Sequence, residues 1–427
     1  MSAAPSSLEI LQYLLQHMDA NKRFEIYLRC PSLRAIERSV PLKIYDLMLA
    51  KGCVDINGTR YNLGIVREYN VGGAPVDVAL ENRIGGVQHE VDRYGIVDLS
   101  DATTVAAGDV DIGRLVRRPP RQQEDDMRML EFKIELYEAE IAAHRERRIV
   151  PSQSFIAQME RLIEKARAEL LAYQNRRDNI TPNYEHFLQI TKSRIIDDQE
   201  QKTIERYHHN KKYSEAVRQL TTMMFGGRSS PIYVTRIHFI GLHDVIRLPV
   251  AVQFHIEQLS VGGYGEASLE ALAPILHESS YPLKKLSIRL LPMDEFNNPI
   301  VRTAGILRIG LRSSEIPRAL SSITNPILHI TILERFVGTP LEEIMTQCVE
   351  SKRPSRTELI ICFYLEPYFA NEMEDILKRL NGVPIDDENV IIPVSDATQL
   401  KASYGPFPEF SPNSKWAVRF LTEAIEH

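Results

Sequence analysis

The chain has 427 residues, of which 44% are hydrophobic and 25% are charged, close to the averages for globular domains. This length suggests two or three domains, and this composition excludes wholesale disorder. The formal net charge of -6 argues against a dedicated nucleic-acid binder, because such proteins usually carry a basic surplus. The four cysteines form no CxxC pair and no apolar run is long enough to span a membrane, so we expect a reduced, intracellular protein, cytoplasmic or nuclear.

The first region, residues 1–41, is expected to form three short helices. Asn21 is the expected N-cap of the second helix, and Pro31 opens the third. Apolar side chains recur along these helices at the spacing of one helical face. The residues of this apolar stripe are Leu8, Leu11, Leu15, Met18, Phe24, Leu28 and Leu33. So small a unit buries little surface by itself, so we expect it to dock on the rest of the chain or on a partner.

Residues 42–115 are expected to form a small antiparallel β-rich region. Asn57-Gly58 lies between two short runs of alternating apolar residues, and this dipeptide favours a type I′ hairpin turn. Residues 65–69 and 86–91 are weaker strand candidates. Adjacent prolines at 119 and 120 then interrupt the chain.

Residues 121–178 are expected to form an antiparallel helical hairpin. Apolar residues follow a heptad spacing in each half, with glutamate and arginine between them. The predicted seam is Met127, Leu130, Ile134, Tyr137 and Ile141 against Phe155, Met159, Leu162, Ala166 and Leu170. The helices could pack within one chain or form a dimeric coiled coil, and the intramolecular arrangement is favoured.

Residues 182–427 are expected to form an associated α/β domain. A β-hairpin turns at Asp197-Asp198, and from about residue 232 short apolar strands recur at intervals of about 20–30 residues, near the period of leucine-rich repeats. The strand cores begin at Ile237, Leu259, Leu286, Leu307, Ile330 and Ile360. We therefore predict a degenerate, open parallel α/β layer of leucine-rich-repeat-like form, with Trp416 on a final capping helix.

The sequence contains little that indicates catalysis. The glycine-rich turn at 262–267 resembles a dinucleotide-binding turn, but Ser268 stands where the third glycine would be, so a plain strand-to-helix turn is favoured. The twelve histidines do not occur at metal-ligand spacings, and Cys30 is surrounded by apolar residues. We expect no catalytic residue, metal or cofactor, and neither nucleic acid nor a membrane as a partner.

The N-terminal stretch from Leu8 to Arg34 resembles an F-box, and more closely the opening of the nematode F-box C proteins. The resemblance continues at residues 56–65 and 85–88, and recurs at residues 228–234, 247–250 and 279–283. It implies an α+β protein of several regions: F-box-like helices, a small antiparallel β region, a helical hairpin and an open α/β layer.

The resemblance also implies a function. F-box proteins join a Skp-type adaptor to a protein substrate within a cullin–RING ubiquitin ligase, so the apolar stripe would bind the adaptor and the remaining domain an unknown substrate. The alternative is an F-box-derived scaffold whose helices no longer engage the adaptor and pack on the β region instead. Ser6-Ser7 replaces the usual Leu-Pro opening of an F-box, which leaves this alternative open.

Overall fold

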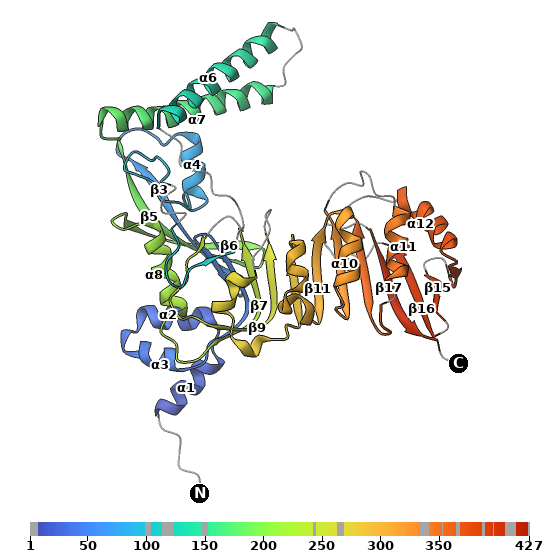
Figure 1. Ribbon diagram of the computed structural model, residues 1–427. Helices are drawn as coiled ribbons and strands as arrows, with labels where there is room; N and C mark the ends of the chain where they lie inside the picture. The colour runs from blue at the N-terminus through green and yellow to red at the C-terminus, as the bar shows by residue number, and fades with distance from the viewer. Residues whose placement is uncertain are drawn as a thin grey trace.

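The computed structural model describes residues 7–98, 104–112, 123–146, 153–241, 245–262, 269–333, 341–351, 353–363, 368–386, 389–395, 397–405 and 416–425. Over these ranges the chain combines helices with one large mixed sheet, as the expected α+β class requires (Figure 1). The predicted break at Pro119-Pro120 and most of the glycine-rich turn lie outside the described residues.

Fifteen strands of the described residues form this sheet, and its order in space differs from the order in the chain. The strands in spatial order are β14 (Val383–Pro384), β15 (Asn389–Ser395), β16 (Thr398–Gly405), β17 (Trp416–Ala424), β13 (Glu358–Phe363), β12 (Ile327–Ile332), β11 (Ile306–Leu311), β10 (Lys285–Ile288), β9 (Phe254–Gly262), β7 (Ile232–Ile240), β1 (Lys43–Ala50), β2 (Cys53–Ile56), β3 (Thr59–Tyr69), β5 (Tyr184–Ile196) and β6 (Gln199–His208). A separate ribbon pairs β4 (Val110–Asp111) with β8 (Val245–Ile246).

The described residues also form helices, whose bounds are as follows. They are α1 (Ser7–His17), α2 (Ala20–Arg29), α3 (Arg34–Ser39), α4 (Val76–Arg83), α6 (Gln123–Glu146), α7 (Gln153–Asp178), α8 (Tyr213–Phe225), α9 (Pro299–Thr303), α10 (Ile316–Ser322), α11 (Leu341–Glu350) and α12 (Tyr368–Arg379). Short 3₁₀ turns are η1 (Pro31–Leu33), η2 (Glu270–Ile275), η3 (Glu278–Ser280), η4 (Met293–Asn297) and η5 (Ser313–Glu315). The spacing of Leu269, Leu272, Ile275 and Leu276 predicts one helix over residues 268–277, and this prediction is wrong. In the described residues η2 and η3 stand in its place, and Pro274 lies inside η2.

The antiparallel part of the sheet forms as predicted at its turns. Asn57 and Gly58 both have positive φ, 52° and 78°, and connect β2 to β3. Asp197 and Asp198, at φ 50° and 59°, connect β5 to β6 in the same way. Residues 65–69 form the end of β3, whereas residues 86–91 form no regular strand and make only isolated bridges at Val87 and Val91.

This antiparallel part is continuous with the C-terminal strands. β1 pairs in parallel with β7, with Lys43 opposite Tyr233. Strands β7, β9, β10, β11, β12 and β13 then pair in parallel in chain order, and they contain all six predicted strand cores. One hydrophobic core runs from Ala20 on α2 to Phe420 on β17.

The C-terminal end departs from the predicted open parallel layer. Trp416 begins strand β17, not a helix, and β17 pairs antiparallel with both β13 and β16. Val418, Phe420 and Thr422 are buried at a spacing of two residues, which is a strand pattern. β17 thereby covers the edge of β13 that would otherwise end the parallel sheet.

The two predicted helices of the hairpin form as α6 and α7, which project away from the sheet at one end of the molecule (Figure 1). Ile141, Met159 and Ile163 are buried between them, and Ile134 and Tyr137 pack against this cluster. Within this single chain, the predicted seam is therefore an intramolecular contact.

Candidate protein-interaction site

The N-terminal helices are fixed to the sheet by polar contacts. Asp19 is the N-cap of α2, because its carboxylate accepts the Asn21 backbone N–H at 2.9 Å. The expected cap, Asn21, is buried instead: its side-chain amide donates to the Ile56 carbonyl (3.0 Å) and accepts from the Tyr61 hydroxyl (2.9 Å). The N-cap predicted at Asn21 is therefore wrong by two residues. The Asn21 side chain does not cap α2 but holds this helix against the β2–β3 hairpin.

A buried ionic triad joins the same helices to the chain 190 residues later. Glu37 on α3 is fully buried and accepts Arg23 Nε at 2.9 Å and Arg228 Nη2 at 3.0 Å. Arg23 also donates to the carbonyls of Val40 (2.8 Å) and Pro41 (2.6 Å). Burial lowers the pKa of both guanidinium groups, and the Glu37 carboxylate opposes this effect. We call this set of side chains, Arg23, Glu37 and Arg228, the ionic lock.

The seven residues of the predicted apolar stripe do not share one surface. Leu15 is fully buried, and Phe24 packs edge-to-face on Phe225 of α8 with ring centroids 6.3 Å apart. Leu11, Met18 and Leu33 are half-buried. The inward members of the stripe therefore attach the helices to the protein's own core.

Another set of apolar side chains faces away from this core. Leu8 and Leu28 are 48% and 52% exposed, and they are the outward members of the predicted stripe. Ile10, Tyr13 and Leu14 of α1 are exposed as well, Tyr13 at 64%. We call the three side chains Ile10, Tyr13 and Leu14, which lie on one side of α1, the exposed apolar face. The helical spacing that predicts the apolar stripe also includes Leu14, whereas it leaves out Ile10 and Tyr13, although the spacing of three and four residues from Ile10 to Tyr13 and Leu14 marks a second side of α1.

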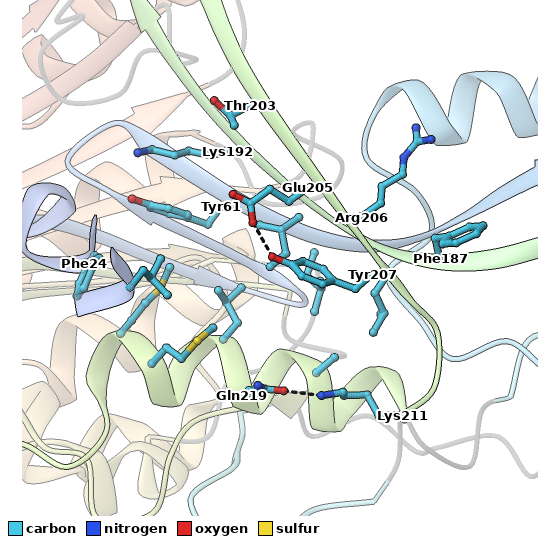
Figure 2. Close-up of a pocket in the computed structure, with 18 of the residues that line it drawn as sticks. Phe24, Tyr61, Phe187, Lys192, Thr203, Glu205, Arg206, Tyr207, Lys211 and Gln219 are labelled. Carbon is cyan, nitrogen blue, oxygen red and sulfur yellow. Dashed lines mark hydrogen bonds between the residues drawn. The ribbon is translucent and has the colours of Figure 1, made fainter. Parts of the chain in front are cut away.

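Leu28 also lines a cleft of about 990 Å³ (Figure 2). Helices α2 and α8 and strands β3, β5 and β6 form its walls. Its apolar lining includes Phe24, Leu28, Leu188, Ile190, Leu220, Met223 and Met224. In Figure 2, the Tyr207 side chain of β6 directs its hydroxyl to the Glu205 carboxylate (2.6 Å), whereas Arg206 points to the other side of the strand. The β6 strand is exposed along its whole length, so the cleft opens along a sheet edge.

Ion pairs line the mouth of the cleft. Glu25 of α2 accepts Lys192 Nζ of β5 at 2.6 Å and Lys22 Nζ at 3.0 Å. The hydrogen bond from Lys192, followed by that from Lys22, lowers the pKa of Glu25 to about 2. Burial raises the pKa of the nearby Tyr61 phenol, so this hydroxyl stays protonated at neutral pH. The lining thus offers apolar contact and fixed charges.

Burial shifts the pKa of the Cys53 and Cys348 thiols and of the His186 imidazole. Burial raises the pKa of Cys53 to about 11 and that of Cys348 to about 12, so both thiols are protonated at neutral pH and are poor nucleophiles. Burial lowers the pKa of His186 to about 4, which keeps this ring neutral. Among the residues that the structure describes, no group of three or more His, Cys, Asp or Glu side chains is placed to hold a metal ion.

Residues 212–356 match the family model of a Domain of unknown function (DUF3557). No curated protein and no solved structure matches the chain. The matched segment begins at α8 and includes the parallel strands from β7 to β12. The resemblance of the N-terminal stretch to an F-box, which lies outside this segment, stays a prediction.

The matched segment and the N-terminal helices meet in the structure. Arg228, inside the matched segment, binds Glu37 of α3, and Phe225 of α8 packs on Phe24 of α2. Helix α8 also forms one wall of the cleft. None of the described helices is both long and apolar enough to cross a membrane.

Proposed function

We propose that the chain is a non-catalytic protein-interaction adaptor that resembles the substrate-recognition subunit of a Skp–cullin–F-box ubiquitin ligase. The exposed apolar face captures the Skp-type adaptor, and the large sheet captures the protein substrate. The observation that carries this proposal is the exposure of Ile10, Tyr13 and Leu14 on one side of α1. Large apolar side chains gathered on one surface are typical of protein-binding sites.

The attachment of these helices supports the same function. A subunit that joins two proteins needs a defined geometry between its two binding surfaces. The ionic lock and the contact between Phe24 and Phe225 provide it, because they fix α2 and α3 to α8 and the sheet. The binding partner on α1 and a partner on the sheet would then be held at a constant distance and orientation.

One observation favours the alternative, a scaffold that no longer engages the adaptor. Leu15 and Phe24, two members of the predicted apolar stripe, are turned into the chain's own core. In this alternative the helices act as a structural cap of the sheet, and the cleft or the sheet is the binding surface. The two functions differ in whether the exposed apolar face binds anything.

Calorimetric titration of the purified chain with a Skp-type adaptor separates them. We expect binding by the unmodified chain, and a loss of at least tenfold in affinity for Leu14→Asp and for Tyr13→Asp, since both residues are exposed and their substitution leaves the core intact. Ile84→Asp, at a residue 74% exposed beyond α4, is the matched control and should bind normally. An unmodified chain that is folded and gives no heat of binding refutes adaptor capture and leaves the scaffold.

A further inference from the structure

The parallel strands present two different faces. Leu286, Leu307 and Leu328 lie opposite one another on β10, β11 and β12, and all are fully buried in the core beneath the helices of this part. The next residues along each strand point to the other face. On that face the register places Ser260, Ser287, Arg308 and His329 in one row across β9 to β12, and Gln258 and Lys285 in the adjacent row.

Lys285 and Arg308 are neighbours on this second face. Lys285 on β10 is opposite Ile306 on β11, and Ser287 is opposite Arg308. Arg308 therefore lies two residues further along the neighbouring strand than the position opposite Lys285. Both side chains are partly exposed. Within the described ranges neither of them forms an ion pair, and Arg308 Nε is buried without a hydrogen-bond partner. The nearest polar contact of Arg308 is His329 Nδ1, at 3.4 Å from its Nη2.

The surroundings of this pair are cationic. Desolvation and the charge of Arg308 lower the pKa of Lys285, and desolvation also lowers the pKa of Arg308. Burial and the charge of Arg308 lower the pKa of His329 to about 4, so this ring is neutral at pH 7 and supplies no negative charge to the pair. Carboxylates on this side of the sheet are already paired: Asp46 contacts Arg236 (3.3 Å) and Glu358 contacts Arg419 (2.6 Å).

Two adjacent, half-buried cations without a counter-ion destabilise a fold, because each loses hydration and repels the other. Titratable groups perturbed by burial and by a neighbouring charge cluster at functional sites. A bound group with two negative charges would offset both cations, and the planar guanidinium of Arg308 suits the oxygens of a phosphate. The hydroxyls of Ser260 and Ser287 in the neighbouring positions are further possible donors.

The same face continues into exposed aromatic side chains. Tyr45 of β1 is 62% exposed and lies beneath the Arg236 guanidinium, which is 4.7 Å from its ring centroid. Tyr233 of β7 is 43% exposed and contacts the His255 ring of β9 at 5.1 Å. A free phosphate ion would not use these rings, whereas a polypeptide lying across the strands would contact them on one side of its charged group.

We propose that Lys285 and Arg308 bind a phosphorylated side chain of a partner protein, whose flanking residues contact Tyr45 and Tyr233 on the same sheet face. This binding site goes beyond the adaptor function proposed above and does not depend on it. Helices pack on the opposite face of these strands, so the partner lies on the second face, where Ser287, Lys285 and Arg308 are partly exposed.

The test uses the full chain with two probes. The first is inorganic phosphate at constant ionic strength, followed by the melting temperature. The second is a fluorescent degenerate peptide library with one fixed phosphoserine, compared by anisotropy with the same library carrying serine. We expect the chain to bind the phosphorylated library at least tenfold more tightly, and phosphate to raise the melting temperature.

Matched variants assign the effect to the two cations. Arg308→Gln and Lys285→Gln should each weaken binding of the phosphorylated library about tenfold or more, in line with the loss of a hydrogen bond to a charged group. Without phosphate, both variants should melt no lower than the unmodified chain, because each removes an unpaired charge. Arg302→Gln on α9 and Lys284→Gln, whose exposed ammonium pairs with Glu257, remove the same charge and should bind normally.

Tyr45→Ala separates a partner protein from a free ion. It should weaken peptide binding and leave the stabilisation by inorganic phosphate unchanged. If phosphate stabilises the chain but the two libraries bind equally, the site takes a free ion and the proposed partner is wrong. If neither probe responds to Arg308→Gln or Lys285→Gln, or if these variants melt lower than their controls without phosphate, the cations are structural and the site does not exist.

Discussion

Neutralising Glu37 tests whether the N-terminal helices are an integral part of the fold. In Glu37→Gln the side chain keeps its shape but loses its charge, so Arg23 and Arg228 are left as two buried cations without an anion. Their side chains are 1% and 4% exposed, which leaves almost no solvent to stabilise the charges. Removing one partner of a buried ion pair costs about 3–5 kcal/mol. We expect a loss of that size in the free energy of unfolding.

Urea unfolding followed by two probes measures this loss. Far-UV circular dichroism reports all helices and strands, whereas fluorescence of Trp416, the only tryptophan of the chain, reports β17 at the far end of the sheet. Because one core joins α2 to β17, we expect both signals to shift together. The matched control is Glu25→Gln, whose carboxylate forms ion pairs near the surface, so its loss should cost at most about 1 kcal/mol.

A double-variant cycle then tests the cause. Arg228→Met should destabilise the unmodified chain, but in the Glu37→Gln background it removes an uncompensated charge and should restore part of the loss. The coupling energy should be about 1–3 kcal/mol. The reasoning is refuted if Glu37→Gln unfolds within about 1 kcal/mol of the unmodified chain, or if Arg228→Met costs the same in both backgrounds.

Three further predictions concern other parts of the fold. Light scattering should show a monomer, because the seam of α6 and α7 is closed within the chain; a dimer that dissociates on deletion of residues 124–176 would contradict this. Leu307→Asp should reduce hydrogen-exchange protection in β10 and β12 as well as β11, since Leu307 is fully buried between them; loss confined to β11 would show that the strands are independent. Burial lowers the pKa of His186 to about 4 in the folded chain, against about 6.5 in the unfolded chain. Between these two pH values the unfolded chain binds more protons at this residue. The contribution of His186 to stability is therefore present above this range and is lost as pH falls through it. His186→Asn should flatten this part of the stability profile, and an unchanged pH slope would contradict the assigned pKa.

The two β-hairpins and the helical hairpin could be predicted, because each depends on residues close together in the sequence. Asn57-Gly58 and Asp197-Asp198 tolerate positive φ, so the turns of both hairpins follow from the residues themselves. The heptad spacing around Ile141 predicts the hairpin of α6 and α7 in the same way. These features need no knowledge of distant parts of the chain.

The features that were predicted wrongly or not at all depend on contacts between segments far apart in the sequence. β17 lies between β13 and β16, and its strand conformation depends on two neighbours that the local sequence does not identify. The apolar residues near Trp416 fit a helical spacing as well as a strand. The pairing of β1 with β7, nearly 190 residues apart, likewise follows from the tertiary fold and not from the sequence pattern.

Charged residues were the largest omission for the candidate sites, because the sequence pattern suggests that they are solvated. The structure instead buries a carboxylate between two arginines twice: Glu37 between Arg23 and Arg228, and Asp109, which contacts Arg218 (2.8 Å) and Arg247 (2.7 Å). In both places the fold supplies an anion for the cations that it buries.

Not every buried cation has such an anion: Arg353 is buried and donates to the carbonyls of Ile323 and Asn325 instead. Lys285 and Arg308 have neither kind of partner among the described residues. They are half-buried on neighbouring strands, and in the described part of the chain no carboxylate pairs with either of them. If their role were to stabilise the sheet, an acidic side chain at Ser260 or Ser287 would complete the arrangement at no cost in space on an open face. Serine at these positions instead leaves room and hydrogen-bond donors for an anion from outside the chain. The two buried triads and Arg353 are each satisfied within the chain, so the unsatisfied pair of Lys285 and Arg308 favours binding over folding as its role.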